Sequence, residues 1–71
     1  MEQGYGDLFQ ATVDALNSMG LTVYEAKAYV ALLQKHPSHG HEISRRSGVP
    51  GPKIYETLNR MTQKGLVAVL D

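Results

Sequence analysis

Residues 41–64, HEISRRSGVPGPKIYETLNRMTQK, constrain the fold more than any other stretch of this chain. A short helix is predicted over 41–47, because the Gly-Val-Pro sequence at 48–50 is a strong turn signal. A longer helix is predicted over 51–64, because Pro is favoured in the first turn of a helix and Gly just beyond its end, and both rules are met. A short helix, a tight turn and a longer helix form the helix-turn-helix arrangement.

In proteins with this arrangement, the second helix enters the major groove of DNA. At 100° per residue, Ile54, Leu58 and Met61 fall within about 60° of one another and are predicted to face the core. The opposite surface is polar and partly basic, with one aromatic side chain, which suits base edges and phosphates. The candidate DNA-contacting residues are Gly51, Pro52, Lys53, Tyr55, Glu56, Asn59 and Arg60 on the second motif helix, with His41 and Arg46 on the first.

Lys53, near the start of the second motif helix, is the strongest single candidate for a DNA contact. Tyr55 either donates to a phosphate or packs beside the core. Glu56 either accepts from a cytosine amino group or pairs with Arg60, four residues later, in the favoured order of charges. Asn59 is of the type that reads adenine.

Three further basic side chains, Arg45, Arg46 and Lys64, are interpreted either as phosphate contacts or as charges that keep the surface soluble. His41 is predicted to open the first motif helix, where backbone donors often meet a phosphate.

The net charge of the chain is zero, but the charges are unevenly distributed. Residues 1–32 hold four acidic residues and one basic residue, a net charge of −3. Residues 33–71 hold six basic and three acidic residues, a net charge of +3. The positive charge therefore gathers in and around the predicted motif, as expected of a nucleic-acid-binding surface.

Two helices are predicted before the motif. A helix over 22–35 begins at a capping box made by Thr22 and Glu25, and it is apolar on nearly all sides. Such a helix must be covered on more than one side, by the N-terminal helix and the motif or, in part, by a second subunit. The other helix spans 7–19 and has a single apolar stripe: Leu8, Phe9, Val13, Leu16 and Met19.

Residues 66–70, Leu-Val-Ala-Val-Leu, are predicted to form a strand. A lone strand is unstable, and in a winged helix it would be the first arm of a hairpin and would also pair with a short strand near Ser38. The returning arm is absent, which predicts a piece of a longer protein that ends within the wing. The expected fold of residues 1–71 is one mostly α domain, a winged helix-turn-helix with an extra N-terminal helix and a truncated wing.

Several classes of function are disfavoured by the sequence. The chain has no Cys, and the three His straddle a Pro and a Gly, so neither a disulfide framework nor a metal site is expected. No catalytic triad signature, Gly-rich phosphate loop or cofactor motif is present, so no enzyme is expected. No apolar run is long enough to cross a membrane and no signal peptide is recognisable, which predicts a cytoplasmic protein.

Two stretches, LTVYEAKAYVALL at 21–33 and GVPGPKIYETLNRMTQKGLV at 48–67, resemble the N-terminal winged-helix domain of the TrmB family of transcriptional regulators. In that family, Arg-Ser commonly stands where this chain has Gly51 and Pro52. The resemblance implies binding of operator DNA as a homodimer. It also implies an effector, for many members a sugar, bound by a C-terminal domain that these 71 residues do not contain.

The sequence thus supports two hypotheses. The first is sequence-specific binding of double-stranded DNA with the second motif helix in the major groove. The alternative is a winged-helix module used for protein–protein contact or dimerisation without DNA binding, which the zero net charge, the Gly at position 51 and the nearly all-round apolar helix favour.

Overall fold

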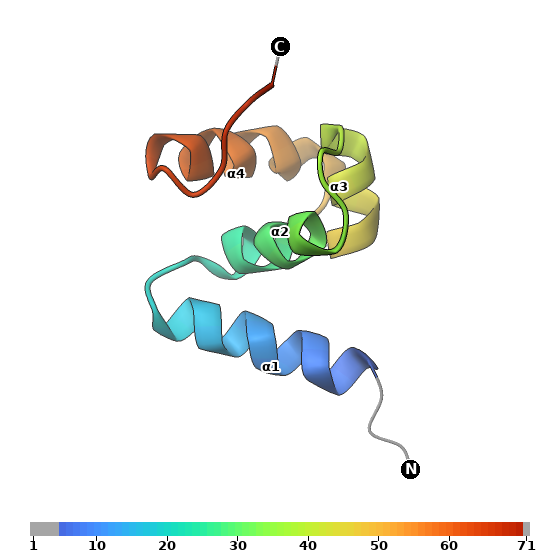
Figure 1. Ribbon diagram of the computed structural model, residues 1–71, viewed down its shortest axis with the longest axis vertical. Coiled ribbons are helices and arrows are strands. Elements are labelled where there is room, and N and C mark those ends of the chain that lie inside the picture. Colours follow the sequence, from blue (N-terminus) through green and yellow to red (C-terminus); the bar gives the residue numbers. More distant parts are fainter. Residues whose placement is uncertain (1–4, 71) are drawn as a thin grey trace.

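The computed structural model describes residues 5–70, which form four helices and no strand (Figure 1). Every helix boundary lies within two residues of the predicted one. The mostly α helix-turn-helix fold expected from the sequence is confirmed. The helices are α1 (Tyr5–Ser18), α2 (Val23–Gln34), α3 (Gly40–Ser47) and α4 (Gly51–Gln63).

Short-range hydrogen bonds fix the ends of the helices. Thr22 and Glu25 form the predicted capping box of α2: the Thr22 hydroxyl accepts from the Glu25 backbone, and the Glu25 carboxylate accepts from the Thr22 backbone. Gly65 ends α4 with a φ of 77°, and the Leu66 backbone N–H donates to the Met61 carbonyl at 2.9 Å. This left-handed Gly and its backward hydrogen bond are the features of a Schellman cap.

Helix α2 lies at the centre of the molecule, between α1 on one side and α3 and α4 on the other (Figure 1). Two separate apolar clusters lie against it, so the N-terminal helix and the motif each cover one side as predicted, although Val23, Tyr24 and Leu33 remain exposed. The cluster shared with α1 is built on Val13, Ala26 and Val30. The cluster shared with α3 and α4 is built on Ala28, Ala31, Ile43, Val49, Ile54 and Met61.

Part of the stripe predicted for the first helix is not buried. Val13 is buried, but Leu8 and Met19 are exposed. The reason is that α1 contacts only α2, and one neighbouring helix covers a narrow arc of its surface. Leu8 lies about 140° from Val13 around the helix axis and therefore outside that arc.

The strand predicted over 66–70 is not present in the structure, nor is one near Ser38. Residues 67–70 are irregular, although Leu66 and Val67 pack against the larger cluster. A strand exists only with a hydrogen-bonded neighbour, and no second extended segment pairs with this one within residues 5–70.

Candidate nucleic-acid interface

The two helices of the motif are joined by a turn that their own side chains hold. Gly48 adopts a φ of 83°, a left-handed conformation that favours glycine, and its N–H donates to the Ser44 carbonyl. The Ser44 hydroxyl donates to the Val49 carbonyl, and the Ser47 hydroxyl accepts from the Val49 N–H. Val49 itself is buried in the larger cluster. The path of the chain between α3 and α4 is therefore fixed by both packing and hydrogen bonds.

Helix α4 buries one side and exposes the other. Ile54 and Met61 are fully buried, and Leu58 is half-buried, as predicted. Thr57 is also buried, and its hydroxyl donates to the Lys53 carbonyl within the helix. The exposed side carries every candidate that the sequence assigned to this helix: Gly51, Pro52, Lys53, Tyr55, Glu56, Asn59 and Arg60.

These exposed residues divide into three strips along α4. At 100° per residue, Pro52, Glu56 and Asn59 lie opposite the buried side. Lys53 and Arg60 lie within about 20° of each other on one flank. Tyr55 lies on the other flank, more than 100° from Lys53. A polar central strip with a basic border can meet base edges and one phosphate backbone at the same time.

Glu56 and Arg60 form an ion pair on this surface. The Arg60 guanidinium donates to the Glu56 carboxylate at 3.3 Å, and both side chains are about half exposed. An exposed pair at this spacing stabilises a helix by only a few tenths of a kcal/mol. The pair matters more for the charge of this surface. Because Arg60 is neutralised by Glu56, Lys53 is the main unpaired cation of α4.

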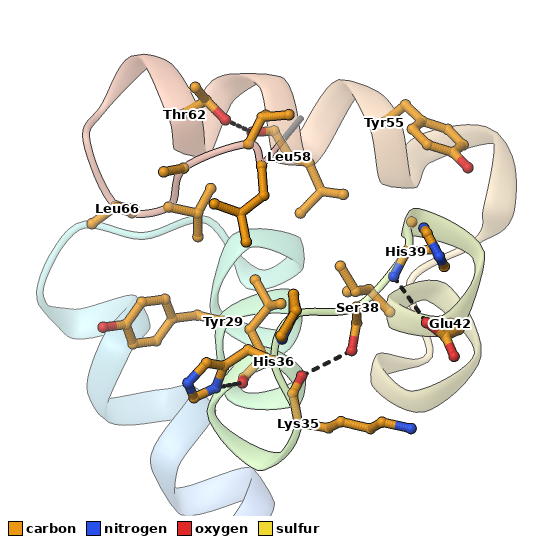
Figure 2. Close-up of a pocket in the computed structure, with 18 of the residues that line it drawn as sticks. Tyr29, Lys35, His36, Ser38, His39, Glu42, Tyr55, Leu58, Thr62 and Leu66 are labelled. Atoms are coloured by element: carbon orange, nitrogen blue, oxygen red, sulfur yellow. Dashed lines mark hydrogen bonds between the residues drawn. The ribbon is translucent and has the colours of Figure 1, made fainter.

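Tyr55 leans towards the start of α3, as Figure 2 shows. A Cβ atom at Gly40 would lie 2.5 Å from Tyr55 Cε1 and 2.9 Å from its hydroxyl oxygen. The ring therefore rests on the Gly40 backbone, while 64% of the residue stays exposed. Of the two interpretations given for Tyr55, packing is the one whose contact is observed.

The two candidates on α3 are both exposed, His41 in the first turn of the helix and Arg46 in the last. His39, not His41, occupies the N-cap of α3, so the expectation that His41 opens this helix is wrong. The His41 ring stacks on that of His39, with 6.1 Å between the ring centroids. Arg45 and Arg46 lie in the last turn, where positive charge complements the helix dipole.

One ion pair links residues far apart in the sequence and was missed by sequence reasoning. The Lys64 ammonium donates to the Glu25 carboxylate at 2.8 Å. Glu25 is fully buried, whereas the Lys64 side chain is 44% exposed. Lys64 was interpreted as a phosphate contact or a solubilising charge, but it is held by a buried carboxylate. Glu25 appeared in the sequence only as half of a capping box, and nothing local pointed to Lys64.

The pKa of Glu25 is lowered. Burial by itself raises this pKa, but the hydrogen bonds from Lys64 and from the Thr22 backbone, together with the charges of Lys64 and Arg60, outweigh it. The carboxylate is therefore ionised at neutral pH although it is buried.

A groove of about 1100 Å³ lies on the Tyr55 side of α4 (Figure 2). Its floor and walls come from α2, the connector after it, α3, α4 and the segment after α4. Most of the lining is apolar, including Leu33, Leu58, Leu66, Val69 and Leu70. Leu33, Val69 and Leu70 are exposed there. The motif thus has two different surfaces, a polar one on α4 and an apolar one beside it.

Residues 5–70 contain no cluster of three or more His, Asp or Glu side chains able to hold a metal ion. None of the four helices combines the length and the apolar character that crossing a membrane requires.

Comparison with known proteins gives a consistent result. The family model described as "Sugar-specific transcriptional regulator TrmB" matches residues 16–71. The chain is similar to "Uncharacterized protein YrhO" of Bacillus subtilis, with 46% identity over 57 residues, or 80% of this chain and 21% of that protein. It is also similar to "HTH-type sugar sensing transcriptional regulator TrmBL1" of Pyrococcus furiosus, with 35% identity over 63 residues, or 89% of this chain and 18% of that protein.

The chain thus spans about a fifth of the length of these two relatives. No solved structure matches it.

Proposed function

The chain belongs to the TrmB family of transcriptional regulators, and on this premise we propose that it binds double-stranded DNA sequence-specifically, with α4 in the major groove. The exposed polar side of α4 supports the proposal. It presents Pro52, Glu56 and Asn59 in a central strip with Lys53 beside them. No carboxylate within residues 6–70 pairs with Lys53, so its charge is available to a phosphate.

In this proposal the remaining candidates have different tasks. Lys53 contacts a phosphate or a base near the start of α4, and Asn59 reads a base edge. Arg46 and His41 reach the flanking backbone from α3. Gly51 leaves room for the sugar-phosphate chain to approach the start of α4. Tyr55 sets the angle between α3 and α4 through its contact with Gly40.

We further propose that the domain is part of a longer, dimeric regulator. The domain acts in the cytoplasm as one half of a homodimer, so that two copies of α4 read half-sites about 34 Å apart. An effector, possibly a sugar, binds a C-terminal domain rather than these 71 residues. No catalytic activity and no cofactor are assigned to the chain.

One observation favours the alternative, a module for protein–protein contact. The groove beside α4 is largely apolar, and Leu33, Val69 and Leu70 are exposed within it. Large exposed apolar surface commonly marks an interaction site. The zero net charge of the chain is compatible with this function as well.

Selection of random DNA duplexes by the purified 71-residue chain, followed by titration of the enriched duplex at several salt concentrations, tests the proposal. We expect enrichment of one sequence and an affinity that falls steeply with salt, because phosphate contacts release counterions. If no sequence is enriched, and the affinity of the chain for the unselected duplexes does not change with salt, DNA binding is rejected and the protein-contact module is favoured.

A further inference from the structure

The ion pair of Glu25 and Lys64 has no part in the DNA contacts described above, although Lys64 caps the C-terminal end of α4. Lys64 follows the last residue of α4, and Glu25 lies in the first turn of α2. The two are 39 residues apart in the sequence. The pair therefore joins the C-terminal end of one helix to the N-terminal end of another.

One oxygen accepts both of the hydrogen bonds made by the Glu25 carboxylate. Its Oε1 atom accepts from the Lys64 ammonium at 2.8 Å and from the Thr22 backbone at 2.9 Å. Its Oε2 atom is buried and has no hydrogen-bond partner among the described residues. A carboxylate that is half unsatisfied is a poor way to stabilise a core, since an apolar side chain of similar size often does as well or better. This arrangement points to a task in addition to stability.

The apolar contacts of α4 decide which side of the helix faces the core, because Ile54 and Met61 are fully buried in the larger cluster. The hydrophobic effect itself has no preferred direction, so a polar contact at the end of α4 adds a different kind of constraint. The ion pair is directional, because it joins one nitrogen to one oxygen. Lys64 lies within about 20° of Lys53 around the axis of α4, so holding Lys64 also fixes the direction in which Lys53 projects.

We propose that Glu25 is a positioning residue for DNA recognition: by holding Lys64, it sets the rotation of α4 and thereby the direction in which Lys53 and Asn59 meet the DNA. This inference rests on the proposed DNA binding. It assigns a buried residue of α2, which touches no DNA, a share in both affinity and sequence discrimination.

The replacement Glu25→Gln separates positioning from simple electrostatics. It removes one negative charge but keeps the size of the side chain and one oxygen that can accept from the Thr22 backbone. The hydrogen bond from Lys64 to that oxygen becomes weaker, because the acceptor is no longer charged. If the carboxylate acted only through its charge, the variant would bind DNA more tightly, with a steeper salt dependence because the Lys64 charge is no longer neutralised. If Glu25 positions α4, the variant binds its selected duplex more weakly although the protein has become more positive.

The experiment measures the affinity of the folded wild-type and variant chains for the duplex selected by the wild-type protein and for a scrambled duplex. We expect Glu25→Gln to weaken binding to the selected duplex by about 2- to 30-fold and to leave binding to the scrambled duplex nearly unchanged. Lys64→Met should behave in the same way, and Lys64→Arg, which keeps a charged donor, should restore most of the affinity. Asp14→Asn on α1 is the matched control, because it removes one negative charge from an exposed site and should not weaken binding.

Equal or tighter binding of the selected duplex by Glu25→Gln would overturn the inference while the proposed function stands. A wild-type chain that selects no duplex would overturn both. Circular dichroism at the assay temperature must show that each variant is folded, so that a loss of stability is not read as a loss of affinity. A purely structural role would lower the melting temperature without changing the ratio of selected to scrambled affinity.

Discussion

Lys53 differs from the other basic residues of the α4 surface, because Arg60 is paired with Glu56 and Lys64 with Glu25. We expect Lys53→Ala to weaken DNA binding and to reduce the slope of log affinity against log salt by about one. Titration of the selected duplex at four or more salt concentrations measures that slope. Lys27→Ala, outside the motif, is the control for loss of one positive charge.

An unchanged slope for Lys53→Ala would remove this residue from the phosphate contacts. A change of equal size for Lys27→Ala would show that overall charge, rather than position on α4, determines the slope.

Gly40 and Tyr55 form the second residue-scale feature, because the ring occupies the space that a Cβ at position 40 would fill. In a helix, Gly→Ala usually stabilises by about 0.5–1 kcal/mol. We expect Gly40→Ala to give no such stabilisation in the wild-type background, since Tyr55 must move. When Tyr55 is also replaced by Ala, Gly40→Ala should stabilise the protein by the usual amount. Chemical denaturation of the four proteins in this double-mutant cycle measures the coupling.

Gly51→Ala provides the matched comparison, because Gly51 also begins a helix and nothing lies within 4 Å of an added Cβ there. Strictly additive effects of the Gly40 and Tyr55 replacements would contradict the contact.

At the scale of the elements, each helix begins and ends where its local sequence predicts, within two residues. The capping box of α2 and the glycines after α1, α3 and α4 act over four or five residues, so they can be recognised without the fold. The segment after α4 could not be assigned in this way. These residues favour extended structure, but a strand requires a second, paired segment, and residues 66–70 have no such neighbour among residues 5–70.

The link between α2 and α4 makes stability dependent on pH. Because the pKa of Glu25 is lower in the folded chain than its ordinary value of 4.5, ionisation favours the folded state above that value. This contribution is lost as the pH falls through the folded pKa. We expect the free energy of unfolding of the wild-type chain to fall as the pH drops below about 4.5, and to fall less in Glu25→Gln.

Urea denaturation at a series of pH values measures this dependence. The pKa of Glu42 is also lowered, mainly by its hydrogen bond from the His39 backbone. Glu42 therefore also contributes to the loss of stability at acid pH. Glu42→Gln is therefore the control variant. Identical acid-side slopes for wild type and Glu25→Gln would contradict a lowered Glu25 pKa.

At the scale of the whole molecule, α1 depends on α2 alone, whereas α2, α3 and α4 contact one another. The two core clusters on opposite sides of α2 therefore join different helices: the smaller one joins α1 to α2, and the larger one joins α2, α3 and α4. We expect Met61→Ala, in the larger cluster, to cost about 2–5 kcal/mol and to destabilise the whole domain. Val13→Ala, in the smaller cluster, should cost about 1–3 kcal/mol and act mainly on α1.

Amide hydrogen exchange distinguishes the two effects. Faster exchange confined to α1 is expected for Val13→Ala, and faster exchange throughout for Met61→Ala. Uniform acceleration in both variants would show that the domain opens only as one cooperative unit.

The sequence by itself determined the helices, the turn at residues 48–50, the inward face of α4 and the set of exposed candidates on its surface. These features depend on residues a few positions apart, so the helical period and the capping rules suffice to find them. Only the tertiary structure decided that Lys64 is held by Glu25, that Tyr55 rests on Gly40, and that Leu8 and Met19 remain exposed. Each of these depends on which surfaces of distant segments meet, and the sequence pattern of a single helix does not contain that information.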